Sequence, residues 1–460
     1  MENKRLEEFK KNIKGKKVSV IGMGVSNIPA IKYLNKLGAY VIGRDKKDKI
    51  PEELKQLENI EFLTGEDYLK NLKESDYIFR SPGVKPSTPE IVEAVESGVI
   101  LTSEMETFIH LTTATVIAIT GSDGKTTTTT LTSLFLKESG KKVYVGGNIG
   151  TPLLDKVEKM TSEDFVVLEL SSFQLMTMKE RIHRAAITNL APNHLDYHKD
   201  YEEYIEAKTN IFKSQNEGDI LVLNQDDELT PRFEKLAKGA IREFSIKDSV
   251  RCGVYYKDGK IISSVENNEG KIMDAKDVKL VGMHNIANIC TAASLVIDIC
   301  GKDAIKKVAM SFGGVEHRME LVREINGVKW YNDSIASSPS RTIAGLKAFN
   351  KKIILIAGGY DKHIPYDVMG PYLIDKVKLL ILVGTTSNKI KESALQEAKK
   401  QGVEPMPIVE FNNLKDAVDY ANKNAKNGDI VAMSPASASF DLYENFMVRG
   451  EYFKELVSKL

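Results

Sequence analysis

The stretch Ala-Ile-Thr-Gly-Ser-Asp-Gly-Lys-Thr-Thr, residues 118–127, decides how this chain is interpreted. It follows an apolar segment, 115–119, that is typical of a buried strand, and it opens a Thr-rich helical segment that ends near Gly140. A strand, a glycine-bearing loop, a lysine followed by a hydroxyl, and a helix are, in this order, the parts of a phosphate-binding P-loop. The sequence therefore predicts a site for the phosphates of ATP, in preference to a plain strand–turn–helix corner.

Each residue type in this loop has a chemical role in binding phosphate. Gly121 and Gly124 let the backbone turn tightly, so that successive N–H groups face an anion. Lys125 adds a positive charge for the outer phosphates, and Thr126 offers a hydroxyl to Mg²⁺. The spacing G-x-x-G-K-T-T replaces the common G-x-x-x-x-G-K-T. The residues predicted to hold ATP here are Gly121, Ser122, Asp123, Gly124, Lys125, Thr126 and Thr127.

The composition predicts a soluble, intracellular protein of several α/β domains. At 460 residues the chain exceeds a single core, and its alternating strand and helix patterns predict about three domains, each a mainly parallel sheet with flanking helices. Lys plus Arg and Asp plus Glu both number 64, so the zero net charge gives no nucleic-acid footprint. Three scattered cysteines fit a reducing cytoplasm, and no apolar run is expected to approach the ~18 residues of a membrane span.

The first part of the chain predicts a small doubly wound, Rossmann-like sheet that begins with a G-x-G turn. Gly22-Met-Gly24 follows an apolar strand, and Asp45 comes about 20 residues later, at the end of the next strand. Asn27 stands where a dinucleotide fingerprint has its third glycine, which weakens an NAD interpretation. Lys46-Lys47 favours a ligand with phosphates, while a tight turn without a ligand remains the alternative.

Two strand ends in the middle of the chain carry polar side chains. Glu169 lies in the apolar run 165–170, where P-loop enzymes place a metal-binding acid, although a salt-bridged core acid would give the same pattern. His194 follows the apolar segment 186–190, and this position favours a functional role over a merely solvated histidine. The signal for the neighbouring His198 is weaker.

Two later helical segments give ambiguous signals. Lys208 lies in the segment 201–213 and is, on composition alone, a surface lysine. Asn285 and Asn288 are three residues apart near the start of a long Ala-rich helix and share one face. That face suits either a ligand or the capping of the helix itself, and the residues leave both interpretations open.

Taken together, the motifs form one order, which reads GSDGKTT, GNIG, LELSSFQL, NHLD, AK, HNIAN, EHR, NDS, GGYDK and SPASAS. This order resembles the Mur ligase family over nearly the whole chain, from Gly22 to Phe446. The resemblance implies a cytoplasmic, monomeric, ATP-dependent amide ligase of peptidoglycan precursor synthesis that joins D-glutamate to UDP-N-acetylmuramoyl-L-alanine. It also implies a precursor-binding domain in 1–108, a P-loop domain in 109–312 and an amino-acid-binding domain in 313–460.

The resemblance further implies roles for individual residues. ATP would be held by the P-loop together with Asn285, Asn288, Arg318 and Asp333, and two Mg²⁺ ions by Thr126, Glu169, His194 and a Lys208 carbamylated by CO₂. The catalytic set would be Lys125, Asn148, His194 and Lys208, with Asn148 beside the reacting carboxylate. The precursor would be bound by Ser26, Asp45, Lys46 and Lys47, and the amino acid by Ser337, Lys362, Ser439 and Phe446.

Two stretches depart from the family pattern. Where the D-glutamate ligases commonly read Asp-Ser-Lys-Ala-Thr, this chain has Ile335 in place of the lysine and Ser337 in place of the threonine. Arg341 is a candidate to supply the missing charge. The family's Asp-Thr-Arg becomes Asp45-Lys46-Lys47, and lysine meets a phosphate without the bidentate geometry of arginine.

Three other functions fit parts of the sequence. One is a ligase of the same design with a different amino acid or acceptor, such as another Mur-type ligase or a folylpolyglutamate synthase. The G-x-G unit argues against the folate enzymes, because that group lacks such a unit ahead of its P-loop. A switch or transport ATPase would hydrolyse ATP without an amine substrate. An NAD-dependent oxidoreductase would use Gly22-x-Gly24 and would leave the P-loop unexplained.

Overall fold

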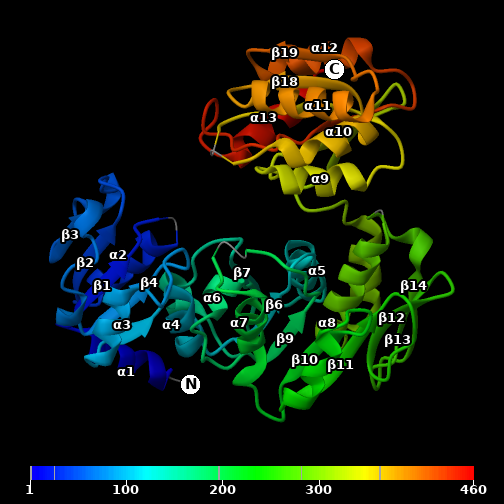
Figure 1. Ribbon diagram of the computed structural model, residues 1–460. Helices are drawn as coiled ribbons and strands as arrows, with labels where there is room; N and C mark the ends of the chain where they lie inside the picture. The colour runs from blue at the N-terminus through cyan, green and yellow to red at the C-terminus, as the bar shows by residue number, and fades with distance from the viewer. Residues whose placement is uncertain (1–2, 25, 195–196, 281, 362–363) are drawn as a thin grey trace. The chain divides into compact units, whose positions relative to one another are not determined.

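The computed structural model describes residues 3–24, 26–194, 197–280, 282–361 and 364–460, and this part of the chain forms three sheets (Figure 1). The chain divides into two compact units, residues 1–311 and 312–460. The first unit contains two of the sheets and the second unit contains the third. All three are wholly or mainly parallel and carry helices between their strands, as the predicted α/β class requires.

The first sheet is wholly parallel, in the strand order β3-β2-β1-β4-β5. Its strands are β1 (Lys17–Ile21), β2 (Tyr40–Asp45), β3 (Ile60–Thr64), β4 (Tyr77–Arg80) and β5 (Ile100–Thr102). The helices around it are α1 (Lys4–Ile13), α2 (Asn27–Lys36), α3 (Pro89–Glu96) and α4 (Glu104–Leu111). The carboxyl ends of β1, β2 and β4 therefore meet at one edge, where the G-x-G turn lies.

Asn27 has a structural task at this turn. It is buried, and its Nδ2 donates to the carbonyls of Ile21 and Gly22 at 3.1 and 2.9 Å. These bonds fasten the start of α2 to the end of β1, which is the close approach that a glycine usually permits. Where a third glycine would leave room for the helix and the strand to approach, the Asn27 side chain instead forms hydrogen bonds with the strand backbone.

The second sheet has the order β14-β13-β12-β11-β10-β9-β6-β8-β7, and it is parallel from β7 to β12 and antiparallel beyond. Its strands are β6 (Thr115–Thr120), β7 (Val143–Gly147), β8 (Phe165–Glu169), β9 (Arg184–Ile187), β10 (Ile220–Asn224), β11 (Ala240–Ser245), β12 (Gly253–Lys257), β13 (Lys260–Ser263) and β14 (Gly270–Asp274). The helices are α5 (Lys125–Glu138), α6 (Ser172–Leu175), α7 (Tyr201–Lys213) and α8 (Met283–Ser311). Strands β9, β6 and β8 are neighbours, so the loops after them share one edge.

Helix α8 is long and apolar enough to cross a membrane by length and composition, a possibility that the sequence-based expectation overlooked. Its apolar window is 61% buried inside the first unit, where it packs against α5 and the strands β11 and β12. The helical conformation is also interrupted at Gly301, which has φ 72° and ψ 171°. Burial against its own sheet identifies α8 as a core helix.

The third sheet has the order β15-β16-β20-β17-β18-β19. Its strands are β15 (Glu320–Ile325), β16 (Val328–Asn332), β17 (Ile353–Ala357), β18 (Val377–Val383), β19 (Ile408–Phe411) and β20 (Ile430–Met433), and its helices are α9 (Pro339–Lys347), α10 (Gly370–Lys376), α11 (Ser387–Gln401), α12 (Leu414–Asn424) and α13 (Phe446–Ser458). Alternate residues of β17 join two different cores, one with α9–α11 and one with α12 and α13. A strand covered on both faces explains its continuous apolar run.

Candidate functional site

The predicted P-loop connects the buried strand β6 to helix α5 as the sequence indicates. Gly121 has φ 144° and Gly124 has φ 80°, and α5 begins at Lys125. The Nζ of Lys125 donates to the carbonyls of Gly121 and Ser122, at 2.9 Å in both cases. The ammonium group is therefore held over the loop, next to the amides that open α5, where positive potential for an anion gathers.

Glycine is required at both turning points for space as well as for conformation. A Cβ on Gly121 would lie 1.9 Å from Oγ1 of Thr188, and a Cβ on Gly124 would lie 2.4 Å from Oδ1 of Asn288. Thr188 follows β9 and Asn288 lies in α8, so the loop is wedged between two elements that are distant in sequence.

Glu169, at the end of β8, carries an unsatisfied carboxylate oxygen. The side chain is buried, and its Oε1 accepts a hydrogen bond from Nδ2 of Asn148 at 2.8 Å. Among the described residues, nothing donates to the other oxygen, Oε2, although it is also buried. A buried carboxylate oxygen without a donor is costly unless a cation satisfies it, and a carboxylate oxygen is a ligand that Mg²⁺ prefers. The donor set at this strand end fits the predicted metal.

Lys208 is buried, so its interpretation as a surface lysine was wrong. Its Nζ donates to Oγ1 of Thr120 at 3.2 Å and to the carbonyl of Gly121 at 2.9 Å, and it lies 4.7 Å from the centre of the Tyr204 ring. Burial, and secondarily the charge of Lys125, hold the pKa of Lys208 well below its usual range. An amine whose charged form is disfavoured by burial therefore lies directly beside the phosphate loop.

The two histidines after β9 have different environments. His194 is exposed with φ 55°, and its ring packs edge-on against Phe173, with the ring centres 4.9 Å apart. His198 is buried, with Nε2 2.9 Å from Oγ of Ser172, and burial lowers its pKa. His198 is therefore a packed core histidine, whereas His194 lies on the exposed part of the loop. Asp196, from the same motif, lies outside the described residues.

The asparagine pair of α8 lies against the P-loop helix. Nδ2 of Asn288 is 3.2 Å from Oδ1 of Asn285, and Oγ1 of Thr128 is 3.4 Å from Oδ1 of Asn288. Asn288 is buried and Asn285 is half-buried. The fold thus brings Asn288 next to Gly124 and Thr128, across more than 150 residues of sequence.

The predicted precursor-binding residues lie at the edge of the first sheet. Ser26 is exposed just before α2, and Lys46 and Lys47 are exposed after β2. Asp45 accepts hydrogen bonds from the amides of Met23 and Lys47, at 2.8 and 2.9 Å. Asp45 therefore links the G-x-G turn to the neighbouring strand end.

The second unit carries the remaining predicted residues. Arg318 is exposed, whereas Asp333 is buried and accepts hydrogen bonds from Ser434 Oγ at 2.7 Å and from the amide of Met319 at 3.2 Å. Burial raises the pKa of Asp333 to about 6. Ser439 is buried, and Ser337 and Phe446 are half-buried, whereas Lys362 lies outside the described residues.

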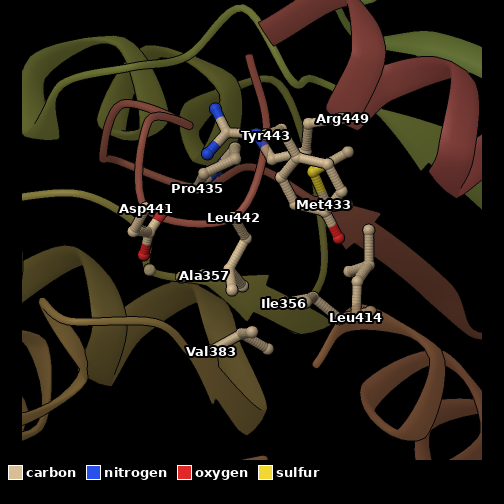
Figure 2. A pocket seen from close by; sticks show the side chains of 12 residues that line it. Ile356, Ala357, Val383, Leu414, Met433, Pro435, Asp441, Leu442, Tyr443 and Arg449 are labelled. Atoms are coloured by element: carbon tan, nitrogen blue, oxygen red, sulfur yellow. The ribbon is translucent and has the colours of Figure 1, made fainter. Parts of the chain in front are cut away.

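Arg449 was missed by the sequence analysis. Its buried guanidinium donates to the Ser334 hydroxyl and to the carbonyls of Ser334, Ser437 and Ala438, at 2.9–3.0 Å. It thereby joins the segment after β16 to the segment after β20. A small cavity beside it (Figure 2) has a volume of about 20 Å³, which is room for one water and not for an amino acid. The sequence signal that could have identified it is its spacing of four and eight residues from the apolar Phe453 and Val457, which places all three on one face of a helix.

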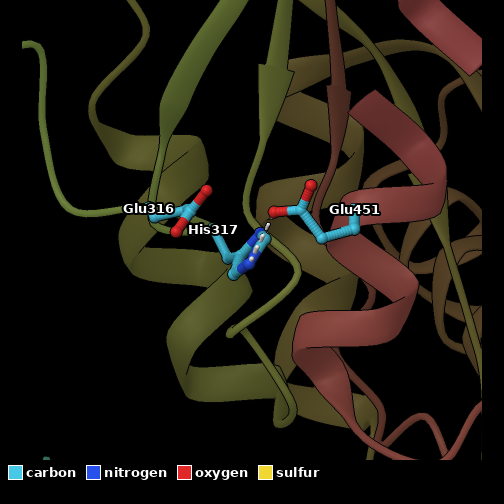
Figure 3. A group of neighbouring side chains, drawn as sticks. All are labelled: Glu316, His317 and Glu451. Atoms are coloured by element: carbon cyan, nitrogen blue, oxygen red, sulfur yellow. Dashed lines mark ion pairs between the residues drawn. The ribbon is translucent and has the colours of Figure 1, made fainter. Parts of the chain in front are cut away.

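Glu316, His317 and Glu451 form the one group of three or more acidic, His or Cys side chains found within metal-binding reach in the described part of the chain (Figure 3). Lys454 already pairs with Glu316 and Glu451 at 2.5 and 3.1 Å. An ammonium group in this position opposes a metal cation, so the group is an ion-pair network.

The fold and the loop define a class: an α/β protein with a P-loop nucleotide site and further sheets on either side of it in sequence. Family models match three stretches in succession: the Mur ligase MurD-like N-terminal domain over residues 16–103, the Mur ligase middle domain over 119–296, and the Mur ligase glutamate ligase domain over 317–437. The chain belongs to the Mur ligase family.

Relatives and solved structures agree with this assignment. The chain is 50% identical to the UDP-N-acetylmuramoylalanine–D-glutamate ligase of Acetivibrio thermocellus, over 100% of this chain and 99% of the relative, and 50% identical to the protein of the same name from Ruminiclostridium cellulolyticum, over 100% of both. Its fold is similar to that of UDP-N-acetylmuramate-alanine ligase MurC from Thermotoga maritima (TM-score 0.58, 18% identity, 96% and 99% of the two chains) and to that of MurF from Acinetobacter baumannii (TM-score 0.57, 14% identity, 97% and 92%).

Proposed function

We propose that this chain uses ATP to join D-glutamate to UDP-N-acetylmuramoyl-L-alanine, with release of ADP and phosphate. The relatives that bear this activity in their name match the chain from end to end. The observation that carries the chemistry is the unsatisfied Oε2 of Glu169 at the same sheet edge as the P-loop and Lys208. This edge combines an anion site with a cation site, as activation of a carboxylate by ATP requires.

The reaction has two steps. A carboxylate is a poor acyl donor, so an oxygen of the alanyl carboxylate first attacks the γ-phosphorus of ATP, the bond to ADP breaks, and an acyl phosphate forms. The neutral amine of D-glutamate then attacks the acyl carbon, loses a proton, and phosphate leaves as the amide forms. Lys125, held over the loop by two carbonyls, stabilises the negative charge that gathers on the phosphate.

We propose two Mg²⁺ sites. Thr126 and Glu169 would hold the first, and His194 with a modified Lys208 the second; bound Mg²⁺ would neutralise the charge crowded between phosphate and carboxylate. Asn148 donates to Glu169 and so fixes the carboxylate while Oε2 stays available. We propose Asn148 as the residue that also orients the reacting carboxylate.

Lys208 is the residue that we propose to be carbamylated. The neutral Nζ attacks CO₂, a C–N bond forms and one proton is released, which converts the amine into an anionic carbamate. Its lowered pKa supports this step, because only the neutral amine is nucleophilic. The carbamate would bring a second carboxylate-like group to the edge that holds Glu169.

We further propose that the three sheets belong to functional domains in 1–108, 109–312 and 313–460. The first would bind the precursor through Ser26, Asp45, Lys46 and Lys47, and the third the amino acid through Ser337, Lys362, Ser439 and Phe446. Asn285, Asn288, Arg318 and Asp333 would contact the nucleotide. The proposed place of action is the cytoplasm, where ATP and the nucleotide precursor are available, and the proposed active form is a monomer.

The test is phosphate release from ATP with the precursor present, adding D-glutamate, L-glutamate, D-aspartate, L-lysine or no amine. Release that needs both the precursor and D-glutamate is the expected result. Release with another amino acid would agree with the ligase mechanism, but it would show that the amino acid was wrongly assigned and that Ile335 and Ser337 change the specificity. Steady release without an amine would contradict the ligase proposal and favour an ATPase.

A further inference from the structure

Three side chains connect the first sheet to the loop that carries His194. Arg80 is the last residue of β4, Phe173 lies in α6, and Tyr197 lies between β9 and α7. Nη2 of Arg80 donates to the carbonyl of Phe173 at 3.0 Å, and the rings of Phe173 and Tyr197 have their centres 4.1 Å apart. We call these three residues the Arg80 cluster. All of them belong to the first compact unit.

On one side, the Arg80 cluster holds the segment 81–84 against the G-x-G turn. Arg80 is buried, and its Nη1 donates to the carbonyl of Val84 at 2.7 Å. The amide of Ser81 donates to the carbonyl of Ile21 at 3.0 Å, and a Cβ on Gly22 would lie 2.8 Å from Cβ of Ser81. The Tyr197 hydroxyl donates to the carbonyl of Pro82 at 2.9 Å. A ligand bound at this turn would therefore lie beside the segment 81–84, which is hydrogen-bonded to Tyr197.

On the other side, the Arg80 cluster contacts His194, which is one of the predicted metal ligands. Phe173 lies four residues after Glu169, and its ring is 4.9 Å from the His194 ring. The amides of Tyr197 and His198 both donate to the carbonyl of His194 at 3.0 Å. The Tyr197 side chain therefore fixes the backbone that positions His194. No part of the P-loop mechanism above uses these contacts.

We propose that the Arg80 cluster is a positioning device that couples precursor binding at the first sheet to the placement of His194. When the precursor is bound at the G-x-G edge, the segment 81–84 is restrained. The hydrogen bond from the Tyr197 hydroxyl to Pro82 then restrains Tyr197 and the backbone next to His194. The contact of the Phe173 ring keeps the His194 ring in the orientation that binds the metal. Coupling of this kind is reciprocal, so a metal held by His194 also tightens the precursor site. This inference rests on the proposed function for its ligand, the precursor, and for the metal at His194.

The test measures hydrogen exchange at the amides of Tyr197 and His198, without ATP or metal, before and after UDP-N-acetylmuramoyl-L-alanine is added. In the unmodified protein we expect the precursor to slow exchange at least about fivefold, the lower end of usual coupling factors. In Tyr197→Phe, which keeps the ring and loses only the bond to Pro82, we expect this slowing to disappear. The matched control is Tyr201→Phe, the same chemical change on a ring that packs against Tyr204, and it should retain the slowing.

The outcomes separate the coupling from the proposed function. Slowed exchange at Gly22 and Ser81 with no change at Tyr197 and His198 would overturn the coupling and keep the precursor site. No change at any of the four amides would contradict the precursor site itself. Phe173→Leu is a second variant with the hydroxyl bond intact, and the coupling predicts that it weakens activation by Mg²⁺ about fivefold without raising the KM for ATP. If Phe173→Leu changes the activation by Mg²⁺ and the KM for ATP equally, Phe173 has a merely structural role.

Discussion

At the scale of single residues, Lys208 decides whether the metal arrangement is right. Lys208→Ala should lose most of the D-glutamate-dependent phosphate release, because it removes the group that would carry the carbamate. Lys208→Glu, or Lys208→Ala with added short carboxylates, should recover part of the activity by restoring an anion at this place. Lys213→Ala, an exposed lysine of the same helix, is the control. Equal loss in Lys208→Ala and Lys208→Glu, without recovery by added carboxylates, would contradict the carbamate.

Asp333 gives a prediction about pH and stability. Its native pKa of about 6 lies above the ordinary 3.8, so the native state binds the proton more tightly than the unfolded chain. The stabilising contribution is complete below pH 4 and is lost as the pH rises through 6. Between pH 5 and 7 the loss is on the order of 1 kcal/mol. Trp330, the only tryptophan and fully buried in the second unit, reports this unit's unfolding by urea.

The variant Asp333→Asn removes the titrating group and keeps its shape. Its free energy of unfolding should therefore fall less between pH 5 and 7 than that of the unmodified protein. The Ser434 hydroxyl, which is also 3.0 Å from Thr342 Oγ1, can turn to accept from the new amide. Parallel pH dependences of the two proteins would show that Asp333 is ionised in the native state throughout this range.

At the scale of elements, the junction of β6 and α5 is specified by its glycines. Gly124→Ala places a Cβ 2.4 Å from Oδ1 of Asn288 and also strains a residue at φ 80°. ATP binding should weaken at least about tenfold, because the loss of about 1.4 kcal/mol of binding free energy, through displacement of the loop, already gives that factor. The control is Gly140→Ala at the other end of α5, with φ 81° and open space, which should cost about 1 kcal/mol of stability and leave ATP binding unchanged. Titration calorimetry with ATP compares the two variants directly, and equal affinities would contradict the prediction.

The elements also show what the sequence could predict. The strand–loop–helix order around Lys125 was readable because glycine spacing and apolar runs are local signals. The burial of Lys208 was not read from composition, yet the buried residues Tyr204, Ala207, Ile211 and Phe212 repeat at helical spacing and place Lys208 on the same face. The contact of Asn288 with Gly124 has no local signal, because it depends on how α8 packs over a distant loop; only the family resemblance, which assigns both residues to ATP, implied that they lie close together.

At the scale of the whole molecule, the predicted nucleotide contacts fall in both compact units. Asn285 and Asn288 belong to the first unit, and Arg318 and Asp333 to the second. If both units serve one reaction, Arg318→Ala should raise the KM for ATP about tenfold, since an arginine–phosphate hydrogen bond between charged groups contributes roughly 1.5–3 kcal/mol. The KM for D-glutamate should change little, because the variant removes only a contact with the nucleotide. Arg323→Ala, an exposed arginine of β15 that donates to the carbonyl of Ser458, is the control for charge and surface. Steady-state kinetics of both variants test this prediction: if Arg318→Ala behaves like Arg323→Ala, Arg318 takes no part in binding the nucleotide.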